Sequence, residues 1–211
     1  MKIKEILFRC IFSLAGVIII TLGVAFLNVG NVGVDNFTAF NISMGKILGL
    51  SLGQFQLLIN LVFILFIFLF GKKYMGIGTL ITMTSIGFLI DFFTNIFSNL
   101  IFFELTIFIK ILFLIIGTLL FTFGVSFYIA ANLGVAPYDA ITMILVDYSK
   151  IKYKYIRVAQ DVLFMILALF LGGPVGIGTI INSFFNGPFI DFFYVKISNP
   201  LIKKYIYTFR K

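Results

Sequence analysis

The chain consists mainly of long apolar runs separated by short polar stretches. The run IFSLAGVIIITLGVAFL shows no alternation of apolar and polar residues, which excludes the strand pattern of a membrane β-barrel. Such runs approach the length of about 20 residues that an α-helix needs to cross the hydrocarbon core of a bilayer. The pattern predicts six transmembrane helices, at 6–29, 54–70, 76–97, 106–130, 156–172 and 176–196.

Two further segments, 34–47 (VDNFTAFNISMGKI) and 135–147 (VAPYDAITMILVD), each begin directly after a glycine. They hold too many polar residues, over too short a length, for a full crossing. We expect each to form a short re-entrant or interfacial helix. Backbone that ends within a membrane needs protein or water around its polar groups, and paired segments of this kind indicate a central site.

The sequence repeats itself. Residues 75–93 (MGIGTLITMTSIGFLIDFF) and 175–193 (VGIGTIINSFFNGPFIDFF) agree at ten of the eighteen positions that begin at Gly76 and at Gly176. An earlier pair, 16–34 and 117–135, agrees at eight of nineteen positions. We therefore expect a single transmembrane domain, 1–211, of two related halves near 1–100 and 101–211. Internal repeats mark many transporter folds, although duplication can also build any helical bundle.

Composition and charge support a membrane protein and orient it. The 211 residues are 61% hydrophobic and 11% charged, against about 25% charged in soluble domains. The net charge of +8 requires no nucleic acid, because cytoplasmic loops of membrane proteins are rich in Lys and Arg. With three spans per half and cytoplasmic termini, all basic residues except Lys46 and Lys110 fall inside. If the short segments crossed, Lys72 and Lys73 would lie outside. The distribution of basic residues therefore favours the topology in which the short segments do not cross.

An odd number of spans in each half inverts the second half relative to the first. The predicted fold is therefore an all-α membrane bundle of two inverted-topology repeats, with three spans in each. The phrases NLGVAPYDAITMIL (132–145) and GGPVGIGTIINSFFNGPFID (172–191) resemble the YczE/YyaS/YitT group of bacterial integral membrane proteins. The first half departs from the group where Asp35-Asn36-Phe37-Thr38 replaces Ala136-Pro137-Tyr138-Asp139. The resemblance implies a six-helix protein of the bacterial cytoplasmic membrane and leaves the substrate open.

Two equivalent acids, Asp91 and Asp191, are the first candidates for an ion or substrate pathway. Each lies about fifteen residues into its helix, or roughly 22 Å along it, where an unpaired acid costs about 2.5–3.5 kcal/mol on insertion scales. They would suit a gate on each side of the membrane. In the alternative, each carboxylate only binds a neighbouring helix by a hydrogen bond.

The short segments supply further candidates. Asp139 and Tyr138, with Asp35 and Thr38 as their approximate partners, would line a cavity and coordinate a cation or a proton; Asp139 would otherwise only complement a helix dipole. Buried amides would either bind helices together or line a path. These amides are Asn60, Gln160, Asn182 and Asn186.

Glycines and basic residues have simpler explanations. The helix-start glycines favour close packing, although their N–H groups would also suit an anion; they are Gly76, Gly78, Gly176 and Gly178. We interpret Lys150, Lys152, Lys154 and Arg157 as a cytoplasmic patch that touches anionic lipid. We place Asp161 close to a loop.

We do not expect an enzyme, a metal site or a cofactor. The chain has no histidine and one cysteine, and it lacks nucleotide-binding and esterase motifs. We expect a small secondary transporter or permease for a cation, a proton-coupled solute or a small neutral solute. The alternatives are the substrate-binding subunit of an ATP-driven vitamin transporter and a non-transporting scaffold or assembly factor. Membrane lipid and a small solute are the expected partners; a homodimer would cover the short segments, but no residue pattern demands one.

Overall fold

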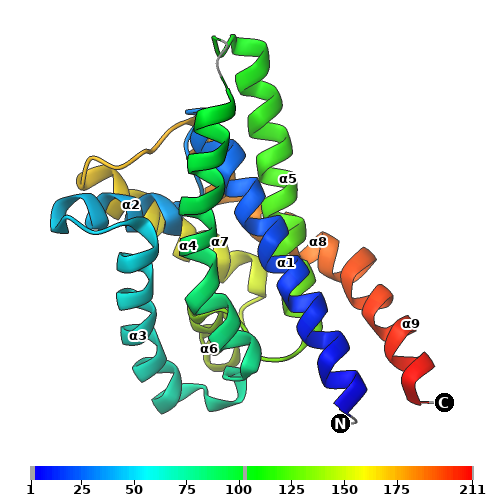
Figure 1. The fold of residues 1–211 in the computed structure, drawn as a ribbon. Helices are drawn as coiled ribbons and strands as arrows, with labels where there is room; N and C mark the ends of the chain where they lie inside the picture. Colours follow the sequence, from blue (N-terminus) through cyan, green and yellow to red (C-terminus); the bar gives the residue numbers. More distant parts are fainter. Residues whose placement is uncertain (1–2, 102–103, 211) are drawn as a thin grey trace.

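The computed structural model describes residues 3–101 and 104–210, and over these residues it is helical, without a strand (Figure 1). The elements are α1 (Ile3–Val29), α2 (Asn36–Leu48), α3 (Leu52–Phe70), the 3-10 turn η1 (Lys72–Tyr74), α4 (Ile77–Leu100), α5 (Ile107–Ala131), α6 (Pro137–Ser149), α7 (Tyr153–Phe170), α8 (Ile177–Phe193), the π-helical turn η2 (Tyr194–Ser198) and α9 (Asn199–Arg210). The six predicted spans correspond to α1, α3, α4, α5, α7 and α8. The two short segments correspond to α2 and α6.

Four helices, α1, α3, α4 and α5, are long and apolar enough to cross a membrane. Helix α7 has 18 residues and carries three charged residues, Lys154, Arg157 and Asp161, whereas α8 has 17 residues. The all-helical membrane class is therefore confirmed, while the count of six spans stays a prediction.

Helices α1 and α5 cross at the centre of the molecule with their backbones in contact. A Cβ atom added at Gly23 would lie 2.7 Å from the carbonyl oxygen of Gly117, and one added at Gly117 would lie 2.8 Å from that of Gly23. Gly16 and Gly124 face each other in the same reciprocal way. Because the later glycine of α1 meets the earlier glycine of α5, the two helices run antiparallel, as Figure 1 shows.

The repeated G-I-G-T phrases join the two halves. The Gly78 N–H donates to the carbonyl oxygen of Leu133 at 2.8 Å, and the Gly178 N–H donates to that of Val32 at 2.8 Å. Each phrase thus begins a helix of its own half and docks on the turn that ends α1 or α5 of the other half. The glycines serve packing, and these two N–H groups are occupied by carbonyl oxygens rather than free for an anion.

The turns that receive these phrases have left-handed backbone, which explains why their residues recur. The φ angles are 49° at Asn31, 92° at Gly33, 52° at Asn132 and 97° at Gly134. Asparagine tolerates this conformation better than most residues, and glycine adopts it without steric cost.

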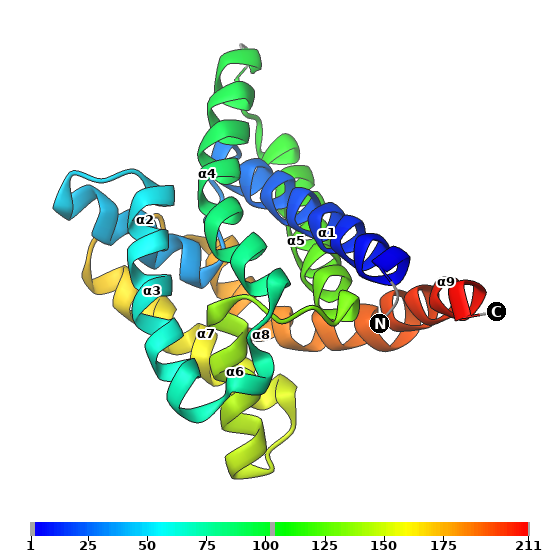
Figure 2. The ribbon, with the colours of Figure 1, turned by 60° about the horizontal axis from the view of Figure 1, so that its bottom comes forward.

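The short helices pack against the opposite half. Helix α2 lies on α7, and α6 contacts both α3 and α7; Figure 2 shows these helices on the side of the molecule away from α9. Within each half, α4 packs on α1 and α3, and α8 packs on α5 and α7. The N-termini of α2 and α6 are consequently brought into the middle of the molecule, among the buried apolar residues of α1, α3 and α5.

The chain continues past the last predicted span. Helix α8 passes through the π-helical turn into α9, where Ile202 and Ile206 are buried against Phe12, Ala130 and Ala131. The side chain of Arg9 donates from Nη1 to the carbonyl oxygen of Ala131 at 2.7 Å. The apolar pattern of the sequence does not reveal α9, because its lysines interrupt the kind of apolar run that marks the other helices.

Candidate functional site

A cavity of about 50 Å³ lies where the short helices begin, with walls from α1, α3, α4, α5 and α7. Phe37 of α2 and Tyr138 of α6 stand on its edge with their rings stacked, 4.4 Å between centroids. These two residues are equivalent in the repeat. A water molecule needs about 10–15 Å³ of such space, so the cavity has room for a few waters or one small ion.

One wall of the cavity is a buried ion cluster, which we call the Arg157 cluster: Arg157, Asp139, Asp161 and Tyr138. The guanidinium of Arg157, 2% exposed, binds Asp139 through Nη1 and Asp161 through Nε at 3.1 Å. The Tyr138 hydroxyl donates to the other oxygen of Asp161 at 2.8 Å. The cluster fastens α6 to α7 and places Asp139, Tyr138 and Arg157 on the cavity surface.

Gln160 completes this fastening rather than lining the cavity. Its Oε1 accepts from Thr142 Oγ1 at 2.6 Å, and its Nε2 donates to the carbonyl oxygen of Tyr138 at 2.9 Å. Both polar atoms of the Gln160 amide are therefore engaged, as a buried amide requires. This corresponds to the helix-binding alternative for a buried amide.

Other residues that line the cavity have polar atoms without a partner. Asp35, 4% exposed, caps α2: its Oδ1 accepts from the Thr38 N–H at 3.1 Å. The other carboxylate oxygen, Oδ2, has no hydrogen-bond partner among the described residues. The same holds for Gln56 Oε1, for Asn60 Oδ1 and for the Tyr128 hydroxyl, and all four side chains line the cavity.

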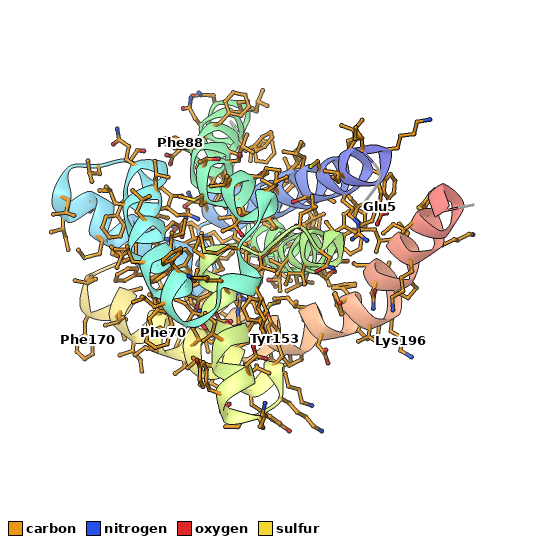
Figure 3. All side chains as sticks on the ribbon, turned by 90° about the horizontal axis from the view of Figure 1, so that it is seen from below. Glu5, Phe70, Phe88, Tyr153, Phe170 and Lys196 are labelled. Carbon is orange, nitrogen blue, oxygen red and sulfur yellow. The ribbon has the colours of Figure 1, made fainter. Side chains whose placement is uncertain are left out.

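Asp91 and Asp191 lie outside the cavity. Asp91 Oδ2 accepts from the Gly53 N–H at the start of α3 at 2.9 Å, which is the hydrogen bond to a neighbouring helix that formed its alternative explanation. Asp191 is exposed and borders a separate hollow of about 240 Å³ with Tyr153 and Tyr194. Figure 3 labels Tyr153 in this region, between α6 and α8.

The amides of α8 form a second buried polar region. Asn182 Oδ1 accepts from Thr118 Oγ1 at 3.0 Å, and Ser183 Oγ donates to Asn36 Oδ1 at 2.9 Å. Neither amide atom of Asn186 has a partner in the part of the chain that the structure describes. These residues do not line the cavity of the Arg157 cluster.

The predictions for two charged residues, Arg157 and Asp161, are wrong. The sequence predicts Arg157 in a cytoplasmic patch that touches anionic lipid and Asp161 close to a loop, yet both side chains are buried, at 2% and 1% exposure. Lys150 and Lys152 are exposed as expected. The available signal was the spacing of Arg157 and Asp161, four residues apart in a helical run, which places opposite charges on one face.

The outer end of α6 is tied to η1 at the surface. Lys73 Nζ lies 2.7 Å from Asp147 Oδ2, and the Tyr74 hydroxyl donates to the same oxygen at 2.6 Å. Hydrogen bonds from Lys73 and Tyr74 hold the pKa of Asp147 below its ordinary value. An exposed pair of this kind contributes little to stability, so the Arg157 cluster is the main polar attachment of α6.

Comparisons with known proteins identify relatives. A family model described as a family of unknown function, DUF6198, matches residues 7–195. "Uncharacterized membrane protein YczE" of Bacillus subtilis (strain 168) is 30% identical over 190 residues, which cover 90% of this chain and 86% of that protein. "Uncharacterized protein YyaS" of the same organism is 26% identical over 189 residues, covering 90% of this chain and 94% of that protein.

No solved structure matches the chain. The resemblance to YczE and YyaS inferred from the G-V-A-P-x-D and G-x-G-T phrases is confirmed by these matches. Because the family model covers most of its length, the chain belongs to the family of unknown function DUF6198.

Proposed function

We propose that the protein is a small secondary transporter or permease of the bacterial cytoplasmic membrane, and that the cavity beside the Arg157 cluster is its solute site. The solute class is a cation, a proton-coupled solute or a small neutral solute. The observation that carries the proposal is the cavity at the N-termini of α2 and α6, which is lined by apolar side chains together with Asp35, Asp139 and Arg157. Discontinuous helices that end at a central site are the usual construction of solute sites in transporters.

The unpartnered atoms in this cavity argue against a purely structural core. Buried polar groups in proteins are nearly always hydrogen-bonded, and burying one without a partner costs about 1–3 kcal/mol by mutational data. Asp35 and Asn60, which line the cavity, each have such an atom, whereas no buried side-chain polar atom of the Arg157 cluster is left without a partner among the described residues. A bound solute or ion would supply the missing partners.

The arrangement of the halves supports six spans in two inverted repeats. The antiparallel crossing of α1 and α5 and the reciprocal docking of the G-I-G-T phrases are the contacts that two halves related by an axis in the membrane plane would make. The remaining spans would be α7 and α8; 17 residues are at the lower limit of a crossing.

The surface supports contact with lipid. Large apolar side chains are exposed on the long helices, among them Leu69 at 73% and Ile107 at 80%. The chain termini, the end of α3 and helix α6 lie toward one end of the molecule (Figure 1). The basic residues near these elements favour placing that end in the cytoplasm.

Flux through the reconstituted protein tests the proposal. Purified full-length protein in liposomes is given gradients of protons and of alkali and ammonium ions, and a panel of vitamins, amino acids and nucleosides is screened for uptake and for a rise in melting temperature. We expect flux of at least one solute that falls in Asp35→Asn and persists in Asp147→Asn, a matched surface acid.

Two results would contradict the transporter and favour another function. Copurification with ATPase subunits, with vitamin binding and no flux, would favour the vitamin-transporter subunit. Absence of flux and of ligand stabilisation, with cavity variants that only melt lower, would favour the scaffold or assembly factor.

A further inference from the structure

The charges around the cavity do not balance. Three buried carboxylates, those of Asp35, Asp139 and Asp161, face one guanidinium, that of Arg157. The N-termini of α2 and α6 add roughly half a positive charge each. About one negative charge is left without compensation, which is the charge that one monovalent cation neutralises.

The uncompensated charge lies at Asp35. Asp139 and Asp161 are both bound directly by Arg157, whereas Asp35 is bound only through Oδ1, by a backbone N–H. Its second oxygen has no partner among the described residues although the side chain is 4% exposed. An isolated buried carboxylate is strongly unfavourable unless it is paired or coordinates a cation.

Three further side chains that line the cavity carry an oxygen without a hydrogen-bond partner among the described residues. They are Gln56 and Asn60 of α3 and Tyr128 of α5, which are 5%, 2% and 1% exposed. Carboxylate, amide carbonyl and hydroxyl oxygens are the ligands that hard cations prefer. Phe37 and Phe121 also line the cavity, beside aliphatic residues such as Ile20 and Val125, and aromatic faces attract a desolvated cation.

We propose that the cavity binds one small dehydrated monovalent cation, an alkali ion or ammonium, between the oxygens of Asp35, Asn60 and Tyr128. The volume of about 50 Å³ admits such an ion with a few waters, and the charge of Asp35 matches it. Only the role of this ion, as the transported ion or as the coupling ion, rests on the proposed function.

The test measures ion binding to the purified full-length protein in detergent. Melting temperature and titration calorimetry are recorded with potassium, sodium and ammonium chloride, at constant ionic strength kept with N-methyl-D-glucamine chloride, whose cation is too large for the cavity. We expect one of the three small cations to raise the melting temperature in a saturable way.

Asp35→Asn removes the charge and keeps the N-cap, because Asn caps helices as well as Asp. We expect it to weaken cation binding by about tenfold to a hundredfold, because the ion keeps an oxygen ligand but loses the negative charge on it. Tyr128→Phe, which is isosteric, weakens binding by roughly fivefold. Asp191→Asn, an acid outside the cavity, leaves the affinity unchanged.

Several results would overturn the inference. One is equal stabilisation by the large cation, and another is retention of binding in both Asp35→Asn and Tyr128→Phe. A third is a melting temperature that depends on pH but on no cation, which would assign the site to a proton. If Asp35→Asn does not fold, Tyr128→Phe decides. Cation binding without flux would support the cation site and contradict the transporter. Flux without cation binding would support the transporter and contradict the cation site.

Discussion

Arg157 is the residue on which the geometry of the site depends. It binds one carboxylate on α6 and one on its own helix, so it sets the position of the short helix relative to α7. Replacing a whole buried ion cluster by apolar residues can be neutral, but removal of one member leaves an uncompensated charge in a medium of low polarity. The two aspartates would then also repel each other.

We expect Arg157→Met to lower the free energy of unfolding by about 3–5 kcal/mol. Arg157→Lys should not restore it, because one ammonium cannot reproduce the forked contacts of a guanidinium. Denaturant titration of the purified protein measures both. Lys152→Met, at an exposed position, is the control and should stay within about 0.5 kcal/mol of the parent; equal losses in both variants would contradict the cluster's role.

At the scale of elements, close backbone approach determines how the helices meet. The glycines of α1 and α5 allow a crossing without side chains between the backbones, and the G-I-G-T phrases let α4 and α8 begin directly against a turn of the other half. A side chain at these positions would have to displace backbone atoms rather than a flexible neighbour. Packing at this level is rigid because interiors are close-packed.

The variants Gly78→Ala and Gly178→Ala test this docking. Alanine in place of glycine normally favours a helix by about 1 kcal/mol. Here the new Cβ would lie 2.9 Å from the carbonyl oxygen of Gly134 and 2.6 Å from that of Gly33, so we expect a loss of about 1–3 kcal/mol from overpacking. Thermal unfolding compares them with Thr84→Ala on the exposed face of α4. Unchanged or higher stability in both glycine variants would refute the docking.

At the scale of the molecule, the two halves cannot be separated. Each short helix packs on the opposite half, and each half supplies the turn on which the other begins a helix. The cavity therefore exists only when both halves are assembled. If the halves rock relative to each other, this is the place where both would act on a bound solute.

The topology predicts which loops share a side of the membrane. In a Cys10→Ser background, single cysteines at Lys4, Lys73 and Lys152 should react with a membrane-impermeant maleimide from one side, and a cysteine at Asn99 from the other. All four positions are exposed. If α2 crossed the membrane, the cysteines at positions 4 and 73 would react from opposite sides. Labelling of inverted and right-side-out vesicles separates the two outcomes.

The amino-acid sequence by itself determined the class of the protein, the approximate positions of its helices except α9, and its repetition. Lipid requires every spanning segment to satisfy its own backbone hydrogen bonds, so a span is a local property that an apolar run reveals. The recurrence of Asn31, Gly33 and the G-I-G-T phrases was visible for a similar reason, because backbone conformation and close approach demand particular residues at particular positions.

Only the tertiary structure decided which polar residues meet. Asp35, Asn60, Tyr128 and Arg157 come from four separate segments, and their convergence depends on how the helices cross and rotate. Arg157 looks like a surface cation in the sequence because hydropathy cannot show whether a charge has a partner. Asp91 and Asp191 match perfectly in the repeat, yet one binds the start of α3 and the other faces a separate hollow. Spacing along a chain places a side chain on a helix face, but the identity of its neighbours is a property of the packed molecule.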